Sequence, residues 1–211
     1  DYIQAVSLFV ARPDCRAWKI KEIIYWRKVN AYAIPLQGED CRMNKPFSKV
    51  LVTGGAGFIG SHLVDRLLAE NYEVTVFDNL SSGNLGNIPY NENKSFNFIR
   101  GDIRRIDEVK TAVKDVEAVF HEAAMISIAT SIQDPILAND INVNGTLNVL
   151  KASVDLGVKR LVFASSAAVY GPSSGPCKKE DVSEFPANPY GLTKLVCENY
   201  ARLFSQLYGL E

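Results

Sequence analysis

The sequence has little net charge, few cysteines and no long apolar run. Its 23 Lys and Arg residues nearly balance 24 Asp and Glu residues, for a formal net charge of −1, which excludes binding to nucleic acid or an anionic membrane through bulk electrostatics. No uninterrupted apolar segment approaches the roughly 20 residues of a membrane-spanning helix. The four cysteines, Cys15, Cys41, Cys177 and Cys197, lie far apart and form no metal-type spacing. We therefore expect a reduced, cytoplasmic protein with no metal, nucleic-acid or membrane partner.

Residues 1–42 differ in composition from the rest of the chain. They contain both tryptophans, Trp18 and Trp26, and their net charge is positive, whereas that of the remainder is negative. They lack the apolar core and cleavage site of a usable signal peptide. We expect Met43 to be the natural start and residues 1–42 to be extra upstream sequence. The alternative is a genuine N-terminal extension.

From residue 49 onward, short apolar runs alternate with longer segments of helical periodicity. The predicted strands are Lys49–Thr53, Glu73–Phe77, Phe96–Arg100, Ala118–His121 and Arg160–Ser165. The predicted helices are Phe58–Glu70, Ile106–Lys114, about Pro135–Leu156 and Pro189–Tyr208. Alternation of this kind indicates βαβ units and a parallel sheet buried on both faces. The fold class expected for residues 43–211 is therefore α/β, a Rossmann-type doubly wound sheet.

A glycine-rich turn joins the first predicted strand to the first predicted helix. Gly54, Gly57 and Gly60 allow a sharp turn and a close approach of the backbone to a pyrophosphate. The N–H groups at the helix start, at Phe58 and Ile59, would face the phosphates. The alternative is a tight turn with no ligand.

Acidic and small residues follow the next three strands. Asp78 ends the second strand, where a carboxylate accepts from ribose hydroxyls. It is followed by Asn79 rather than arginine, which favours NAD over NADP. Asp102 could accept from the adenine amino group while Ile103 packs on the ring, although Asp102 could equally be a turn aspartate. Ala123 and Ala124 are small enough for the dinucleotide to lie against the backbone, and the nearby His121 is interpreted as a structural histidine.

The last predicted helix carries the candidate catalytic pair. Asn188 is the expected N-cap and Pro189 the first helical residue, so Tyr190 and Lys194 lie on one helix face. A lysine ammonium lowers the pKa of a nearby phenol and makes it a usable base. Ser166, at the end of the fifth strand, would meet both residues at the carboxyl edge of the sheet.

With these residues in place, the chain resembles the extended short-chain dehydrogenases/reductases of the NAD-dependent epimerase/dehydratase family. The resemblance rests on Thr53–Gly60, Val76–Leu80, Gly101–Ile103, Asn142–Thr146, Ser165–Gly171 and Pro189–Lys194. It implies a catalytic triad of Ser166, Tyr190 and Lys194. Tyr190 would be the base, Ser166 would hold the reacting hydroxyl, and Lys194 would bind the nicotinamide ribose. Asn142 would position the active-site backbone.

Ala167 and Ala168 distinguish between reactions within this family. Nucleotide-sugar 4,6-dehydratases carry an Asp-Glu pair there, and decarboxylases of the family also carry a Glu, whereas alanine transfers no proton. The resemblance therefore implies a nucleotide-sugar 4-epimerase that uses NAD and a 4-keto intermediate, on a UDP-hexose or UDP-N-acetylhexosamine. Ser127 is the expected substrate contact, in a loop similar to that of UDP-N-acetylhexosamine epimerases but with Ala129 and Thr130 in place of Pro-Arg. The alternatives are a nucleotide-sugar 4-reductase and a non-catalytic NAD-binding protein.

The resemblance also implies parts and partners beyond this segment. In the family a further strand and a uridine-binding substrate domain follow the position of Glu211, so we expect the fold to be truncated there and the chain by itself to be inactive on sugars. Apolar residues occur on more than one face of the predicted helices Pro135–Leu156 and Pro189–Tyr208. Family members dimerise through these helices, so a homodimer is expected. The alternative is that the substrate domain covers those faces.

Overall fold

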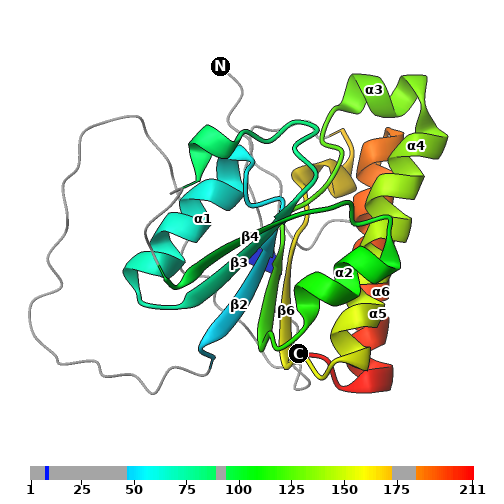
Figure 1. Ribbon diagram of the computed structural model, residues 1–211. Helices are drawn as coiled ribbons and strands as arrows, with labels where there is room; N and C mark the ends of the chain where they lie inside the picture. Colours follow the sequence, from blue (N-terminus) through cyan, green and yellow to red (C-terminus); the bar gives the residue numbers. More distant parts are fainter. Residues whose placement is uncertain (1–7, 10–46, 89–93, 173–183) are drawn as a thin grey trace, which may run out of the picture.

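The computed structural model describes residues 8–9, 47–88, 94–172 and 184–211 (Figure 1). Apart from Leu8–Phe9, the extension expected over residues 1–42 lies outside these ranges, as does the start expected at Met43.

Five parallel strands form the centre of the molecule. They are β2 (Lys49–Thr53), β3 (Glu73–Asp78), β4 (Phe96–Arg100), β5 (Ala118–His121) and β6 (Arg160–Ala164). Their order across the sheet is β4-β3-β2-β5-β6, and the two-residue strand β1 (Leu8–Phe9) pairs antiparallel with β6. All five predicted strands are confirmed. The chain runs outward from β2 to β4 and then crosses to β5 on the other side of β2, so the topological switch point lies between β2 and β5, where such sheets bind ligands.

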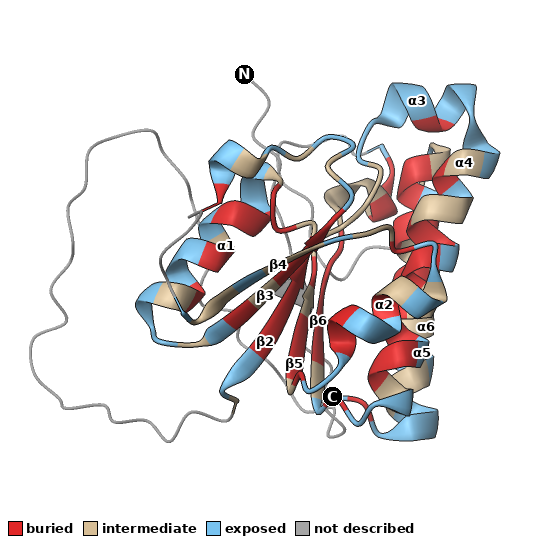
Figure 2. Cartoon of the chain, viewed as in Figure 1, coloured by how far each residue is buried: buried red, intermediate tan, exposed pale blue. Residues whose placement is uncertain are grey.

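Helices cover both faces of this sheet (Figure 1). Helix α1 (Phe58–Ala69) packs on one face. On the other lie α2 (Ile106–Val113), α5 (Gly145–Asp155) and α6 (Pro189–Tyr208). Strands β2, β3, β5 and β6 are largely buried between these layers, whereas the edge strand β4 is partly exposed (Figure 2). Burial on both faces is why the inner strands consist largely of apolar residues rather than alternating with polar ones.

The long helix predicted from Pro135 is interrupted. It consists of α4 (Pro135–Asn139), a π-helical turn η2 (Asp140–Asn144) and α5. A π-turn inserts an extra residue into the helical ladder, and such turns are frequent at functional sites. The short helix α3 (Ile128–Gln133) and the 3-10 turns η1 (Leu85–Asn87) and η3 (Ala167–Tyr170) were not predicted.

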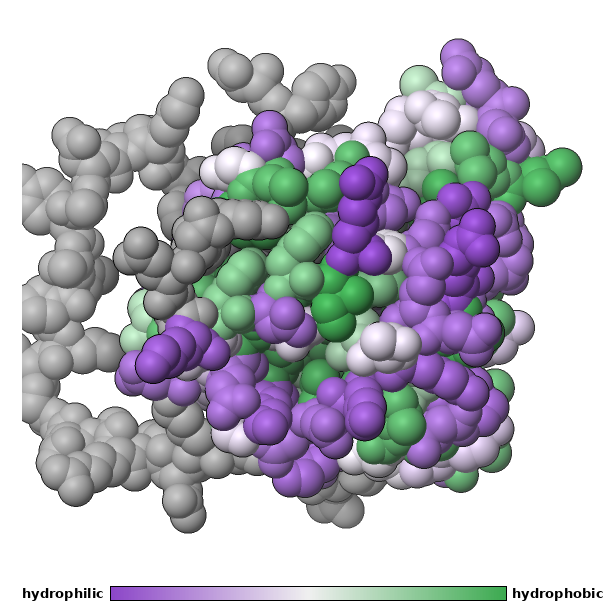
Figure 3. All heavy atoms as spheres, in the orientation of Figure 1, coloured by the Kyte–Doolittle hydropathy of each residue, from purple (hydrophilic) through white to green (hydrophobic). Residues whose placement is uncertain are grey.

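The surface near α3 and α4 is partly apolar. Ile132 and Ile136 are 61% and 81% exposed, and apolar atoms reach the surface at this corner of the molecule (Figure 3). Among the helices in the described ranges, none is both long enough and apolar enough to span a membrane.

Candidate functional site

The glycine-rich turn after β2 forms a backbone cradle at the start of α1. Gly54 has a φ angle of +69°, and a β-carbon on it would lie 2.7 Å from the backbone nitrogen of Ala123, so a larger residue does not fit. A β-carbon on Gly60 would lie 2.3 Å from the carbonyl oxygen of Gly54. The N-cap residue is Gly57, which offers no side chain to the helix end. The cradle therefore suits a phosphate bound by backbone N–H groups.

Helix α1 begins with two residues whose side chains face solvent. Phe58 and Ile59 are 78% and 40% exposed. Their backbone N–H groups belong to the first helical turn, which has no acceptor within the helix. The phosphate contact predicted for these two amides is therefore compatible with the structure.

Asp78 connects the end of β3 to this cradle. Its side chain is buried, and its carboxylate accepts a hydrogen bond from the N–H of Ala56 at 3.0 Å and another from the N–H of Leu80 at 2.7 Å. Leu80 has a φ angle of +61°, unusual for leucine, which allows the chain to fold back over the carboxylate. A carboxylate has about four lone-pair sites, so Asp78 retains acceptors for ribose hydroxyls.

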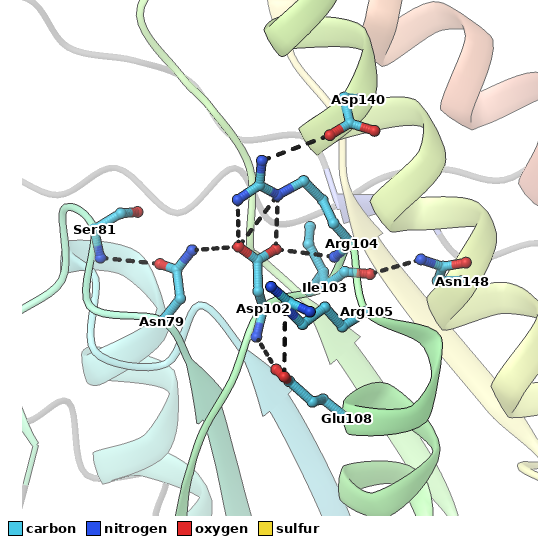
Figure 4. A network of polar contacts seen from close by, with 9 residues as sticks. All are labelled: Asn79, Ser81, Asp102, Ile103, Arg104, Arg105, Glu108, Asp140 and Asn148. Carbon is cyan, nitrogen blue, oxygen red and sulfur yellow. Dashed lines mark hydrogen bonds and ion pairs between the residues drawn. The ribbon is translucent and has the colours of Figure 1, made fainter.

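Asp102 lies at the centre of a polar network that includes Asn79, the residue after Asp78 (Figure 4). Its carboxylate accepts from Nε of Arg104 at 3.0 Å and from Nη2 at 2.7 Å, and from Nδ2 of Asn79 at 3.2 Å. Arg104 also lies 3.5 Å from the carboxylate of Asp140, in the π-turn. The side-chain hydrogen bond from Arg104 is the largest cause that lowers the pKa of Asp102 to about 2. Asp102 is therefore ionised and already holds Arg104 and Asn79.

Contact of Asp102 and Ile103 with adenine stays a prediction. The Asp102 carboxylate is engaged by two neighbours in this structure, so an adenine amino group would have to share or displace one of them. Ile103 is 6% exposed, and its side chain lies against Gly145 at the start of α5, where a β-carbon would be 2.5 Å away. Sequence reasoning missed Arg104, although an arginine two residues from an aspartate is a recognisable ion-pair signal.

Asn142 holds the loop that follows β5. It lies in the π-turn and is 2% exposed. Its Oδ1 accepts from the N–H of Met125 at 2.7 Å, and its Nδ2 donates to the Met125 carbonyl at 3.1 Å and to Oγ1 of Thr193 at 2.9 Å. Ala123 and Ala124 lie between β5 and this anchored point. The side chain thus fixes a loop backbone next to α6, which fits its predicted positioning role.

The structure brings Ser166, Tyr190 and Lys194 together. The hydroxyl of Ser166 lies close enough to Tyr190 to lower the pKa of its phenol, and Oγ of Ser166 accepts from the N–H of Ala168 at 3.2 Å. Lys194 donates to the carbonyl of Ala164, the last residue of β6, at 2.9 Å. The arrangement results from the helix start, where Asn188 caps α6 through its Oδ1 and the N–H of Gly191, at 2.8 Å.

Burial dominates the protonation of this group. It raises the pKa of Tyr190 and Ser166 opposes that effect, so the lowering of this pKa expected from Lys194 is not confirmed. It lowers the pKa of Lys194, which is opposed by Cys197, Glu122 and Glu198. The ammonium lies 4.8 Å from the centre of the Phe163 ring, a favourable cation–π distance. A buried phenol beside a serine hydroxyl, as Tyr190 is beside Ser166, can exchange a proton with a substrate hydroxyl.

Two serines near the site have structural roles. Ser127, the expected substrate contact, is the N-cap of α3: its Oγ accepts from the N–H of Thr130 at 3.1 Å. Its contact with substrate stays a prediction. Ser131, which sequence reasoning missed, is fully buried and accepts from the N–H of Tyr190 at 3.1 Å. It thereby ties α3 to the start of α6.

Known proteins resemble this chain in sequence and in fold. The sequence model of the NAD dependent epimerase/dehydratase family matches residues 50–211. A putative UDP-glucose 4-epimerase of Methanocaldococcus jannaschii is 46% identical over 164 residues, which cover 77% of this chain and 52% of that protein. Two solved structures are similar. The UDP-glucose 4-epimerase of Thermus thermophilus in complex with NAD has a TM-score of 0.71 and 42% identity, covering 77% of this chain and 52% of that one.

The second structure is the UDP-N-acetylglucosamine 4-epimerase of Methanobrevibacter ruminantium in complex with UDP-N-acetylmuramic acid. It has a TM-score of 0.73 and 37% identity, and the match covers 78% of this chain and 53% of that one. The chain thus spans about half the length of the relatives that it matches. Because the family match runs from the first parallel strand to the last residue, the chain belongs to the NAD dependent epimerase/dehydratase family.

Proposed function

We propose that the protein is an NAD-dependent nucleotide-sugar 4-epimerase acting on a UDP-hexose or UDP-N-acetylhexosamine. The observation that carries this proposal is the placement of Ser166 beside Tyr190, next to a turn in which residues 167 and 168 are alanines. The pair would move a proton on and off a sugar hydroxyl, whereas Ala167 and Ala168 have no acid or base that could remove a proton from carbon. This combination favours epimerisation over dehydration.

The described residues fit NAD. Gly54 and Gly60 leave a cradle that a β-carbon would fill, and the first N–H groups of α1 would bind the pyrophosphate. The Asp78 carboxylate would accept from the adenosine ribose and disfavour a 2′-phosphate. When bound, NAD would accept a hydride from the sugar carbon and return it to the opposite face.

The chain's own residues would handle the proton and the positioning. Tyr190 would accept the proton of the sugar 4-hydroxyl, while the Ser166 hydroxyl would hold the same oxygen by a hydrogen bond. The buried ammonium of Lys194 would stabilise the phenolate electrostatically, since a charge acts more strongly in a site that excludes water. The proton would return from Tyr190 to the oxygen once the centre is inverted, so the enzyme would end each cycle unchanged.

The names of the related proteins support a UDP-sugar as substrate, because both UDP-glucose and UDP-N-acetylglucosamine 4-epimerases are among them. We further propose a homodimer formed through α6 and the helical segment made up of α4, η2 and α5. Leu203 and Leu207 of α6 are 43% and 63% exposed, and a second copy would cover them in a symmetric interface.

The test is a sugar analysis with the protein expressed from its complete gene. Incubated with UDP-glucose or UDP-N-acetylglucosamine without reduced cofactor, it should form the matching 4-epimer with no net change in NADH, and Tyr190→Phe should abolish this. Stoichiometric consumption of NADH would identify a 4-reductase instead. Unchanged sugars with NAD bound, in both the parent and Tyr190→Phe, would contradict the proposal and favour a non-catalytic NAD-binding role.

A further inference from the structure

Three consecutive residues at the end of β6 contact α6 at three successive helical turns. Ser166 lies beside Tyr190, the carbonyl of Ala164 accepts from Lys194 at 2.9 Å, and Oγ of Ser165 donates to the carboxylate of Glu198. Residues 190, 194 and 198 are four apart and so lie on one face of the helix. The first two contacts involve the candidate catalytic residues. The third has no role in the mechanism derived above.

The contact between Ser165 and Glu198 is buried. Ser165 is 7% exposed and Glu198 is 5% exposed. The second carboxylate oxygen of Glu198 accepts from Nη2 of Arg202 at 3.2 Å, and Arg202 lies 3.5 Å from Glu184 in the segment before α6. A carboxylate is costly to bury unless its oxygens are hydrogen-bonded, and here both are. Hydrogen bonding of this kind fixes a register, whereas apolar packing would tolerate sliding.

The position of this contact gives it leverage on the active site. Ser165 is the residue before Ser166, and Glu198 is one turn after Lys194. A shift of α6 along β6 would therefore have to break the bond between Ser165 and Glu198 before it could separate Tyr190 from Ser166.

We propose that Glu198 is a positioning residue, whose hydrogen bond from Ser165 fixes α6 against the end of β6 so that Tyr190 meets Ser166. Its purpose rests on the proposed function, but its geometry does not. The charged groups that act on Glu198 are Lys194 and Arg202 on α6 and Glu184 before it. Burial raises the pKa of Glu198, and the bond from Ser165 opposes that effect.

The experiment measures the ionisation of residue 190 in this chain without cofactor or substrate. A ring-fluorinated tyrosine placed at position 190 has a lower phenol pKa than tyrosine, and fluorine NMR reports its titration. Ser165→Ala and Glu198→Ala should each raise this apparent pKa by roughly one to two pH units, which is a ten- to hundredfold change in the ionisation equilibrium. The reason is that Ser166, which favours the phenolate of residue 190, is then held less closely to it.

Two further variants separate positioning from charge and from general loosening. Glu198→Gln removes the charge but retains an oxygen that accepts from Ser165, so its titration should stay near that of the parent. Val109→Ala removes buried methyl groups from α2, a helix that contributes no candidate site residue, and should lower the unfolding temperature without moving the titration. The inference is overturned if Ser165→Ala and Glu198→Ala titrate like the parent, if Glu198→Gln shifts as much as Glu198→Ala, or if Val109→Ala shifts equally.

Activity of the full protein provides an independent measurement. In an epimerase, Ser165→Ala should lower kcat about tenfold while KM changes little, because substrate binding is intact and only the alignment of the base is lost. If the full protein turns over no sugar, the proposed function fails while the fluorine titration still decides the role of Glu198.

Discussion

A β-carbon on Gly191 would lie 2.6 Å from the carbonyl oxygen of Ala168. Gly191 follows Tyr190 in the first turn of α6, and Ala168 lies in the turn η3, two residues after Ser166. The absence of a side chain at residue 191 therefore lets the helix start lie directly against η3. This close approach brings the tyrosine and the serine within hydrogen-bonding reach.

Gly191→Ala should destabilise the protein even though it places a better helix former in a helix. Helix propensity alone predicts a gain of up to about 1 kcal/mol, whereas the clash with Ala168 should cost about 1–3 kcal/mol in the free energy of unfolding. Urea unfolding of the chain measures the difference. Gln206→Ala, at an exposed position of the same helix, serves as the control and should change stability little. A Gly191→Ala protein as stable as the parent would show that the contact relaxes freely.

Asp78→Asn should weaken NAD binding about tenfold or more. The carboxylate accepts N–H groups from Ala56 and Leu80, and an amide would turn an NH₂ group toward one of these donors or toward the ribose. Hydrogen bonds to a charged group contribute about 1.5–3 kcal/mol. The preference for NAD over NADP should also decrease, since the negative charge that repels a 2′-phosphate is gone. Calorimetric titration with both dinucleotides tests this, with the exposed Asp65→Asn on α1 as the matched control. Equal affinities of Asp78→Asn and the parent would remove Asp78 from the site.

The strands and helix α6 could be predicted because local signals determine them. The strands are short apolar runs between polar turns. Helix α6 has a side-chain cap at Asn188 and proline at its first position, and it ends at Gly209, whose φ angle of +71° is left-handed. These signals depend on residues a few positions apart, so they are readable without the fold.

What could not be predicted depends on partners distant in sequence. The π-turn at Asp140–Asn144 interrupts a helix whose apolar spacing gives no sign of an inserted residue. Ser131 and Glu198 are ordinary helix residues until the fold places Tyr190 and Ser165 beside them. Ser127 is the opposite case. The resemblance of its loop to a substrate loop predicts a ligand contact, but its role as the N-cap of α3 already explains a serine at this position.

Leu207→Glu should convert a dimer to a monomer. The side chain is 63% exposed on α6, so the charge costs little in a monomer but would be buried without a partner in a two-helix interface. Light scattering of the full protein should give a dimeric mass for the parent and a monomeric mass for the variant. Asp65→Lys on α1, on the opposite face of the sheet, should leave the dimer intact. A monomeric parent would mean that another part of the protein covers α6.

His121 is held in a neutral state by burial, and both of its ring nitrogens have hydroxyl partners. It is 1% exposed, with Nδ1 2.7 Å from Oγ1 of Thr53 and Nε2 3.0 Å from Oγ1 of Thr146. Oγ1 of Thr53 already accepts from the N–H of Ala123 at 3.3 Å. Oγ1 of Thr146 likewise accepts from Sγ of Cys197 at 3.4 Å, so both hydroxyl partners of the ring belong to a buried network. These contacts support the structural interpretation of His121, because they link Thr53 of β2 to Thr146 of α5.

His121 should make the free energy of unfolding decrease with falling pH at pH values well above those at which Asp102 titrates. Burial is the largest cause that lowers its pKa from 6.5 to about 3, so the unfolded chain binds a proton between these values and the folded chain does not. The resulting contribution to stability is complete above pH 6.5 and decreases as pH falls toward 3, by up to about 1.4 kcal/mol per pH unit. Glu122 and Glu198, whose pKa values burial raises, act in the opposite direction, so the measurement must be a difference between variants.

That difference is between His121→Gln and the parent, followed by urea unfolding from pH 6.5 to pH 4.5. The variant should be less stable than the parent at neutral pH but should lose less stability over this range, because it lacks the group that the unfolded chain protonates. The only other histidine is His62, which is exposed on α1, and His62→Gln is measured alongside as the matched substitution. If His121→Gln and the parent lose stability in parallel, His121 titrates equally in the folded and unfolded chain, and the inference that it is neutral in the folded protein is wrong.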